Sequence, residues 1–494
     1  MEDTIAAIST PFGEGGIGII RISGGNSLSI LNNIFVPASG KPLKNRMMTY
    51  GHIFDDNKNV IDEVMAVFMK APGTYTVEDV AEVNCHGGTV PVRRILSLIL
   101  SKGARLAEPG EFTKRAFLNG RLDLTQAEAV VDLVSAKAEK AFDVAIGQLE
   151  GSLSDRIKEC RNNLTDILVY LAVNIDYPDE DIEEITYEKL ESELLSVVTK
   201  INRLLESHDT GRILKEGLRV AIIGKPNVGK SSLMNALLRE SRAIVTDIPG
   251  TTRDTIEEDI SIRGIPIILI DTAGIRETDD KIEAIGIERS KNSFNKADLT
   301  IMVMDGSCDI ESSDLEILEK LDPKKSIILL NKNDLKSRIT ADDIDRAMEG
   351  KIISGKETQI SDDVSKKPCR SDDVAGNFCD SSVERESLRI GIHSVSLKKI
   401  DDILYIEDIL LNKINAGNTT QKNSPIITNI RHKDLLERAE RAISDAIASV
   451  QLPEPLEIVE IDVKEAYLAL GELLGEEAAD DILEKVFSRF CLGK

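Results

Sequence analysis

The sequence Gly224-Lys225-Pro226-Asn227-Val228-Gly229-Lys230-Ser231 decides how the middle of this chain folds. An aliphatic run, residues 218–223, precedes it, and leucines at helical spacing follow it. A strand, a glycine-bearing loop and a helix in this order make a cradle of backbone N–H groups for phosphates, with Lys230 bridging the outer phosphates and the Ser231 hydroxyl on Mg²⁺. We therefore expect Lys230 to be catalytic and a nucleoside triphosphate to contact Asn227, Val228, Gly229, Lys230, Ser231 and Ser232.

Two later motifs identify the base of the nucleotide. Asp271-Thr272-Ala273-Gly274 ends a second aliphatic run, where the carboxylate can hold Mg²⁺, directly or through water, and the glycine N–H can sense the outermost phosphate. Asn331-Lys332-Asn333-Asp334 ends a third run, where Asp334 can accept hydrogen bonds from the ring N–H and the exocyclic amine of guanine. Adenine lacks this pair of donors, so the expected nucleotide is GTP. Ser396, Leu397 and Lys398 are expected to complete the base contact, mainly through backbone N–H groups.

A polar loop between the first two motifs has the length of a nucleotide-sensing switch. It contains Thr246, Asp247, Ile248, Pro249, Gly250, Thr251 and Thr252. Thr252 is the candidate for a second hydroxyl on Mg²⁺. Ile275 occupies the position after Asp-x-x-Gly and cannot orient the attacking water, so another group must do so. Glu283 is one candidate, although taken alone it also fits a solvated charge on a helix, and the Asn227 side-chain oxygen suits a hard monovalent cation.

The remaining sequence indicates a chain of several domains. At roughly 150 residues per domain, its 494 residues suggest about three. Residues 1–119 mix β-rich runs with glycine turns, which is typical of an α+β unit. Residues 120–214 and 417–494 carry apolar stripes at helical spacing and need each other as packing partners. Residues 215–416 alternate strands and helices, which predicts an α/β domain inserted into a discontinuous helical domain, with residues of about 337–390 forming a polar surface insertion.

Composition excludes several classes of protein. The 61 basic and 85 acidic residues give a formal charge of −24, so the chain is not a bulk binder of nucleic-acid backbones. The acidic N-terminus is unlike a targeting signal, and no apolar run approaches the roughly 20 residues of a membrane helix. The six cysteines form no C-x-x-C pair, which indicates neither a disulfide framework nor a zinc site. We expect a soluble cytoplasmic protein without membrane contact.

Segments outside the GTPase motifs resemble a known family. They include Gly16-Ile17-Gly18-Ile19-Ile20-Arg21-Ile22-Ser23-Gly24, Gly110-Glu111-Phe112-Thr113-Lys114-Arg115-Ala116-Phe117-Leu118-Asn119 and the terminal Phe490-Cys491-Leu492-Gly493-Lys494. Their order around the GTPase motifs resembles the MnmE (TrmE) family of tRNA-modification GTPases over nearly the whole chain. The resemblance implies a Ras-like P-loop GTPase domain inserted into a helical domain and preceded by an α+β folate-binding domain.

The resemblance also implies site residues. Potassium would be surrounded by Asn227, Thr246, Ile248 and Thr251; magnesium would be bound by Ser231 and Thr252; and Glu283 would position the attacking water. A tetrahydrofolate one-carbon derivative would contact Arg21, Glu82, Arg121 and Lys494. Read without the family, Arg21 and Glu82 are ordinary surface charges. The resemblance implicates Cys491 in the modification chemistry, whereas its thiol fits packing beside Phe490 equally well.

The function implied by the resemblance is GTP hydrolysis that drives modification of the wobble uridine of tRNA. The chain would form a homodimer and a heterotetramer with an FAD-dependent protein of the MnmG type, which would hold much of the tRNA. Together they would add an aminomethyl or carboxymethylaminomethyl group, with folate supplying the carbon and glycine or ammonium the nitrogen. The alternative is a regulatory GTPase in ribosome assembly, although the chain lacks the basic RNA-binding domain such proteins commonly carry. A membrane-remodelling GTPase is a weaker alternative.

Overall fold

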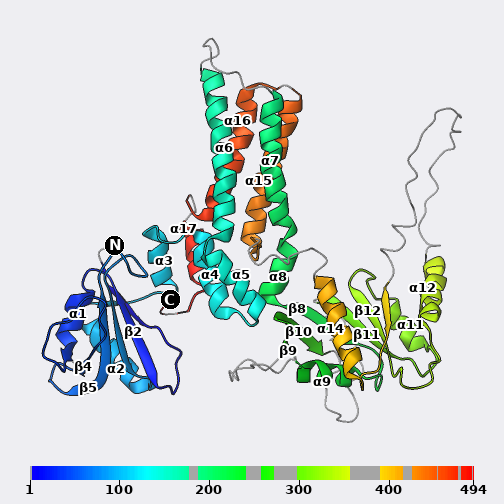
Figure 1. Cartoon of the computed structure of the whole chain (residues 1–494), viewed down its shortest axis with the longest axis horizontal. Coiled ribbons are helices and arrows are strands. Elements are labelled where there is room, and N and C mark those ends of the chain that lie inside the picture. Colours follow the sequence, from blue (N-terminus) through cyan, green and yellow to red (C-terminus); the bar gives the residue numbers. More distant parts are fainter. Residues whose placement is uncertain are drawn as a thin grey trace. The chain divides into compact units, whose positions relative to one another are not determined.

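The computed structural model shows two compact units (Figure 1). One comprises residues 1–136, 142–211 and 420–494, and the other comprises residues 137–141 and 212–419. The structure describes residues 3–176, 187–240, 257–271, 297–355, 390–414, 425–452, 454–476, 480–491 and 493.

The first unit begins with a seven-stranded sheet in the order β3-β4-β5-β6-β2-β1-β7. Neighbouring strands are antiparallel except β1 and β7. The strands are β1 (Ile5–Ile8), β2 (Ile17–Ser23), β3 (Phe35–Pro37), β4 (Thr49–Phe54), β5 (Val60–Met69), β6 (Val80–His86) and β7 (Arg105–Leu106). Side chains alternate across a strand, so Ile20, Ile22, Ala81 and Val83 share one face. They form a buried core with α1 (Ser27–Ile34) and α2 (Thr89–Ser101), so these two helices cover that face.

Four long helices form the second core of this unit (Figure 1). They are α6 (Ser152–Asp176), α7 (Tyr187–Glu206), α15 (Ile430–Gln451) and α16 (Leu456–Leu474). One apolar face of α7, made of Leu190, Leu194, Val197, Ile201 and Leu204, is buried. It packs in one cluster with residues of α15, such as Leu436 and Ile443. The expectation that the first helical block needs the C-terminal block as its packing partner is therefore confirmed.

Five shorter helices complete the helical part of the chain around the bundle. They are α3 (Glu111–Leu118), α4 (Leu124–Ser135), α5 (Glu139–Leu149), α8 (His208–Glu216) and α17 (Asp480–Phe487). Leu149, Leu153 and Ile157 recur at helical spacing. The helix is nevertheless interrupted between them, because α5 ends at Leu149 and Gly151, with φ +101°, separates it from α6. Phe487 and Phe490 pack with Ala116 and Leu124, and so the C-terminal segment returns to α3 and α4 rather than to the four-helix bundle.

The chain re-enters the first unit beside the place where it left. The Ser207 hydroxyl accepts a 3.1 Å hydrogen bond from the N–H of Ile427, and Gln148 Nε2 donates to the carbonyl of Ile426 at 2.7 Å. A Cβ atom added to Gly211 would overlap the Ile427 carbonyl. The backbones of Gly211 and Ile427 are therefore in direct contact, and no residue larger than glycine fits at position 211.

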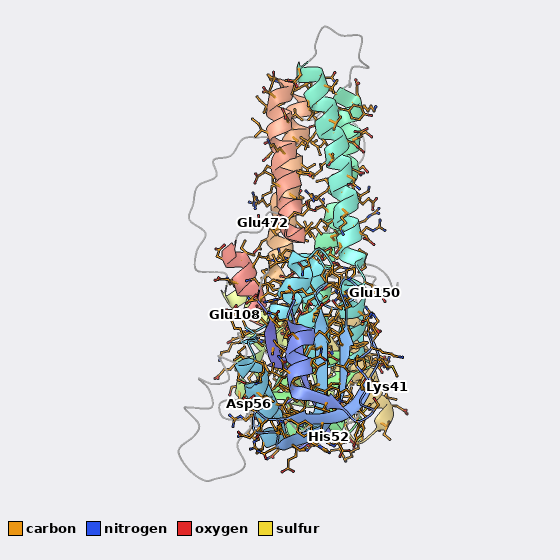
Figure 2. All side chains as sticks on the ribbon, turned by 90° about the vertical axis from the view of Figure 1, so that its left-hand side faces the viewer. Lys41, His52, Asp56, Glu108, Glu150 and Glu472 are labelled. Carbon is orange, nitrogen blue, oxygen red and sulfur yellow. The ribbon has the colours of Figure 1, made fainter. Side chains whose placement is uncertain are left out.

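One buried charge network fixes the two halves of the helical domain together. Glu128 on α4 is about nine-tenths buried and accepts two 3.0 Å hydrogen bonds from Arg431 and one from Nε2 of His432, both on α15. Arg431 also donates to the carbonyls of Glu472 and Leu473 at the end of α16. Glu472 is labelled in Figure 2. Burial alone raises the pKa of Glu128, but His432 and Arg431 outweigh it and hold the pKa far below its usual range.

The second unit is built on a six-stranded sheet in the order β13-β12-β11-β8-β10-β9. All neighbours are parallel except β9 and β10. The strands are β8 (Leu218–Ile223), β9 (Glu257–Ile262), β10 (Ile265–Asp271), β11 (Leu299–Asp305), β12 (Ser326–Asn331) and β13 (Gly391–Ser394). The helices are α9 (Lys230–Glu240), α11 (Ser312–Leu318), α12 (Ala341–Gly355) and α14 (Ile400–Ile414). The predicted mostly parallel sheet, and with it the multidomain α/β and α+β fold class, is confirmed.

The predicted polar insertion at 337–390 is wrong in its first part. Residues 341–355 form α12, and Ile339 and Ile344 are buried with β11 and β12 residues. The many charged residues of this segment concealed the pair Ile344 and Met348, whose spacing of four places both on one helix face. Residues 356–389, which include the repeated Ser-Asp-Asp-Val segments, lie outside the described residues. Within the part that the structure describes, no helix is both long and apolar enough to cross a bilayer.

We predict that Glu128→Gln lowers the free energy of unfolding by about 3 kcal/mol at pH 7, because it breaks a buried charge network. The lowered pKa of Glu128 means that the carboxylate contributes stability above the unfolded-state pKa of about 4.3 and loses it as pH falls below that value. The difference from the parent chain, measured by calorimetry, should stay constant from pH 7 to about 5 and shrink below about 4.5.

The matched control is Glu465→Gln. Glu465 pairs with Arg438 at 2.6 Å, but these side chains are 45% and 41% exposed. An exposed pair contributes about 0–1 kcal/mol, so the control should barely change unfolding. Equal losses in the two variants would contradict the importance assigned to the buried network.

Candidate functional site

The phosphate loop runs from the end of β8 to the start of α9. Its backbone lies in the left-handed region at Asn227 (φ +62°) and Gly229 (φ +113°), and Gly224 has φ +142°. A Cβ atom at Gly224 would overlap the carbonyl of Val303, and one at Gly229 would overlap the side-chain amide of Asn331. These glycines are therefore required by both conformation and space, as the sequence motif predicts.

Two lysines of the loop have different partners. Lys230 Nζ donates to the carbonyls of Gly224 at 2.8 Å and Lys225 at 2.6 Å, so it lies across the loop. Lys225 instead pairs with Asp314 at 2.6 Å and Glu311 at 3.0 Å. Burial lowers the pKa of Lys225, but these two acids outweigh it and raise the pKa overall. The sequence offered no signal for this pairing, because its partners lie on α11 and the turn before it.

Asn331 links the phosphate loop to the base-contacting segment. Its side chain is buried, its Nδ2 donates to the carbonyl of Val228 at 2.8 Å, and its Oδ1 accepts from the N–H of Leu397 at 3.2 Å. Both polar atoms of the amide are thus satisfied by backbone groups from two separate loops. Sequence reasoning treated Asn331 as part of the base motif, and the structure shows that it also braces the phosphate loop.

The residues expected to read guanine lie together at the ends of β12 and β13. Asp334 accepts hydrogen bonds from Lys398 Nζ at 2.6 Å and from the Ser396 hydroxyl at 3.0 Å. These contacts, with Lys398 first, lower the pKa of Asp334, so this carboxylate is ionised at neutral pH. An ionised carboxylate accepts hydrogen bonds only, which matches the two donors on the edge of guanine.

Lys332 is held by a second acid beneath this site. Its backbone is left-handed, with φ +66°, and its Nζ lies 2.5 Å from Asp305. Asp305 also accepts from the N–H and hydroxyl of Ser307. Burial raises the pKa of Asp305, but Lys332 and Ser307 outweigh it and lower the pKa overall. The ion pair with Asp305 therefore fixes the position of the Lys332 side chain.

Several predicted residues lie outside the described residues. They are Thr246, Asp247, Ile248, Pro249, Gly250, Thr251, Thr252, Thr272, Ala273, Gly274, Glu283 and Lys494. Asp271 is the last residue of β10, which places the backbone of the second motif at the sheet edge next to β8. Ser231 and Ser232 are exposed in the first turn of α9.

The magnesium expectation can be tested against the described ligands. The Ser231 hydroxyl is a hard oxygen donor exposed at the start of α9, where Mg²⁺ is expected to bind beside phosphates. No group of three His, Cys, Asp or Glu side chains suited to a metal occurs among the described residues.

A second polar cluster lies in the N-terminal domain. Arg21 on β2 faces Glu82 on β6 across the sheet, and their side chains pair at 2.8 Å. The Arg21 guanidinium carbon lies 5.7 Å from the ring centre of Tyr75, and that of Arg121 lies 4.6 Å from the same ring. Three of the four predicted folate residues are thus grouped around Tyr75, a residue that sequence reasoning missed.

The C-terminus lies against the same domain. The Ser9 hydroxyl donates to the carbonyl of Gly493 at 3.1 Å, and Phe490 packs where a Cβ atom of Gly110 would stand. Cys491 is exposed. Phe490, the residue before it, is buried.

Comparisons with known proteins identify the family. The family profile for the MnmE helical domain matches residues 124–491, and the profile for the GTP-binding protein TrmE N-terminus matches residues 4–121. The tRNA modification GTPase MnmE of Alkaliphilus metalliredigens is 50% identical over all of both chains, and that of Alkaliphilus oremlandii is 46% identical over all of both chains. The chain belongs to the MnmE family of tRNA modification GTPases.

A solved structure is similar to a smaller part of this chain. Era of Aquifex aeolicus bound to GDP and AlF4⁻ is 22% identical, covers 45% of this chain and 66% of its own, and has a TM-score of 0.25. The family assignment depends on the full-length relatives and the two profiles.

We predict that Gly229→Ala weakens GDP binding by about ten- to a hundredfold, because the new methyl group displaces the buried amide of Asn331 and leaves its partners unsatisfied. The matched control is Gly264→Ala in the β9–β10 turn, where φ is +80° but the nearest atom is 3.5 Å away. Titration calorimetry with GDP should show normal affinity for the control. Normal affinity for Gly229→Ala as well would refute the role of the Asn331 brace.

Proposed function

We propose that this chain is the GTP-hydrolysing component of an enzyme that adds an aminomethyl or carboxymethylaminomethyl group to the wobble uridine of tRNA. The observation that carries the proposal is the arrangement of Asp334, Ser396 and Lys398, which suits guanine. Similarity to family members over the full length of the chain also supports it. Hydrolysis would supply a conformational cycle to the flanking domains. The setting would be the cytoplasm, where tRNA is modified.

The GTPase centre would use two cations. Mg²⁺ would be bound by Ser231 and Thr252, and K⁺ by Asn227, Thr246, Ile248 and Thr251. Asn227 is exposed in the loop, with φ +62°, which leaves its side-chain oxygen open to a cation. A bound K⁺ would supply the positive charge that an arginine supplies in other GTPases. Glu283 would position the attacking water, because Ile275 has no polar atom to do so.

The N-terminal domain would bind a tetrahydrofolate one-carbon derivative through Arg21, Glu82, Arg121 and Lys494. The residues present fit such a ligand. Glu82 can accept from pterin N–H donors, and Arg21 and Arg121 can pair with the glutamate carboxylates. The folate would carry the carbon that is transferred, and the protein would bind and orient it.

The chain would act as a homodimer through the outer face of its N-terminal sheet. On that face Tyr50 pairs across strands with Met65, and these residues are 45% and 39% exposed. Met48 is 48% exposed beside them, and the ring of His52, labelled in Figure 2, lies 5.8 Å from that of Tyr50. An open apolar face of this kind marks a protein interface. A second copy fits it best, because the folate-binding role of the domain calls for no other partner there.

The complete enzyme would be a heterotetramer with an FAD-dependent protein of the MnmG type, and tRNA would be held largely by that complex. The charge of −24 supports this division, because the chain has few cations to spare for a phosphate backbone. The alternative of a regulatory GTPase in ribosome assembly is disfavoured by family membership over the whole chain.

We predict that a bacterial strain lacking its own family member regains modified wobble uridines when it expresses this chain, and does not regain them with Asp334→Asn. An asparagine amide presents a donor to the guanine amine and cannot replace the carboxylate. Mass spectrometry of tRNA nucleosides measures the outcome. Unmodified uridines with the parent chain, together with restored ribosome profiles, would support the assembly alternative instead.

We predict that replacing K⁺ with Na⁺ at constant ionic strength lowers kcat for GTP hydrolysis at least about tenfold, since the cation stabilises transition-state charge. Asn227→Ala should remove the difference between the two ions. Asn235→Ala, which changes an exposed asparagine of α9, serves as the control and should retain it. Equal rates in K⁺ and Na⁺ for the parent chain would remove the potassium mechanism.

A further inference from the structure

Tyr75 occupies a position between charges that the proposed function leaves unexplained. Two guanidinium groups lie over its ring, Arg121 at 4.6 Å and Arg21 at 5.7 Å from the ring centre. Arg21 lies equally close to the ring of Phe112, at 5.7 Å. An aromatic face attracts cations within about 6 Å, so one ring holds both arginines.

Only one of these arginines has a carboxylate partner among the described residues. Arg21 pairs with Glu82 at 2.8 Å. No ion pair of Arg121 occurs in that part of the chain, and its side chain is exposed above the Tyr75 ring. The ring therefore orients a guanidinium group that is open to an incoming anion.

The loop that carries Tyr75 is fixed to α3 at three points. The Tyr75 hydroxyl lies 2.9 Å from the hydroxyl of buried Thr113, and Asn119 Nδ2 donates to the carbonyl of Thr76 at 2.6 Å. Arg115, which is fully buried, donates to both carboxylate oxygens of Glu78 at 3.1 and 3.2 Å. These contacts set the direction of the Tyr75 ring and hence the place where the two arginines converge.

The back of the ring is supported by apolar residues. Tyr75 packs against the buried cluster of Ile5, Ala7, Ala107 and Phe112, and also against the cluster that contains Ala116 and Phe490. It is the residue common to both clusters among those described. The ring is thus anchored by packing as well as by its hydroxyl.

We propose that Tyr75 is a positioning residue of the folate site: its ring aims Arg21 and Arg121 at the anionic groups of the ligand. The inference rests on the proposed binding of a tetrahydrofolate derivative. Under this proposal, the affinity for the folate depends on the aromatic face of Tyr75. The tyrosine hydroxyl serves only to fix the ring through its hydrogen bond with Thr113.

The test measures binding of 5-formyltetrahydrofolate to the full chain by titration calorimetry. Tyr75→Leu should raise Kd about tenfold, because both guanidinium groups lose the ring that orients them. Tyr75→Phe keeps the ring and should stay within about threefold of the parent. Thr113→Val should match Tyr75→Phe, and the double variant should add nothing further, since both changes remove the same hydrogen bond.

Tyr170→Leu is the matched control. Lys189 lies 5.0 Å from the Tyr170 ring, so the control also removes a cation from an aromatic face, but on α6. Its folate affinity should equal that of the parent. GTP hydrolysis and the unfolding temperature of every variant report on folding; where Tyr75→Leu fails these checks, Tyr75→Met replaces it with the same thresholds.

The outcomes separate the two proposals. A parent chain that does not bind 5-formyltetrahydrofolate overturns the folate function itself. A parent that binds, with Tyr75→Leu binding equally well, overturns the role of Tyr75 and leaves the folate function standing. A Tyr75→Phe variant as weak as Tyr75→Leu also overturns it, because the hydroxyl and not the ring would then carry the effect.

Discussion

The rest of the first unit depends on one close backbone contact, where the chain re-enters it. Gly211 is the last residue before the inserted unit, and Ile427 follows soon after the return. Their backbones touch because Gly211 has no side chain, and the Ser207 hydroxyl satisfies the Ile427 N–H that this contact buries. An unsatisfied N–H at such a place would cost about 1–3 kcal/mol. The contact lies just before α15, and α15 and α16 bury their apolar stripes in one core with α6 and α7.

The same constraint extends to the far end of the chain. Once α15 and α16 are in place, the network of Glu128 and Arg431 joins α4 to the end of α16. The segment beyond α16 then reaches α3 and α4, where Phe487 and Phe490 complete a small core. The C-terminus thus lies beside the helix that also fixes the Tyr75 loop. Residues separated by most of the chain therefore meet around α3.

Much of the fold follows from local sequence. The aliphatic runs of the second unit are the expected strands, because such runs are short and buried on both faces. The apolar stripe of α7 is the buried face of a helix, because its spacing is helical. Periodicity fails where a segment is short or charged. The turn at Gly151 interrupts a stripe without changing its spacing, and α12 buries only a few apolar residues beneath a charged surface. The place where α17 packs could not be predicted, because its apolar spacing shows which face is buried but not against which helix.

The nucleotide site and the N-terminal polar cluster differ in how far sequence can reveal them, for a physical reason. The nucleotide site is formed by backbone conformation, so it needs glycine at positions such as Gly229. These glycines appear in the sequence as a recognisable motif. The N-terminal cluster is formed by side chains, and Arg21, Tyr75 and Arg121 meet only after β2, a loop and the segment after α3 have packed. No spacing rule links them. The packing of the Tyr75 ring brings two guanidinium groups together in a strongly acidic chain. Composition cannot reveal such a cluster, because it averages over all residues.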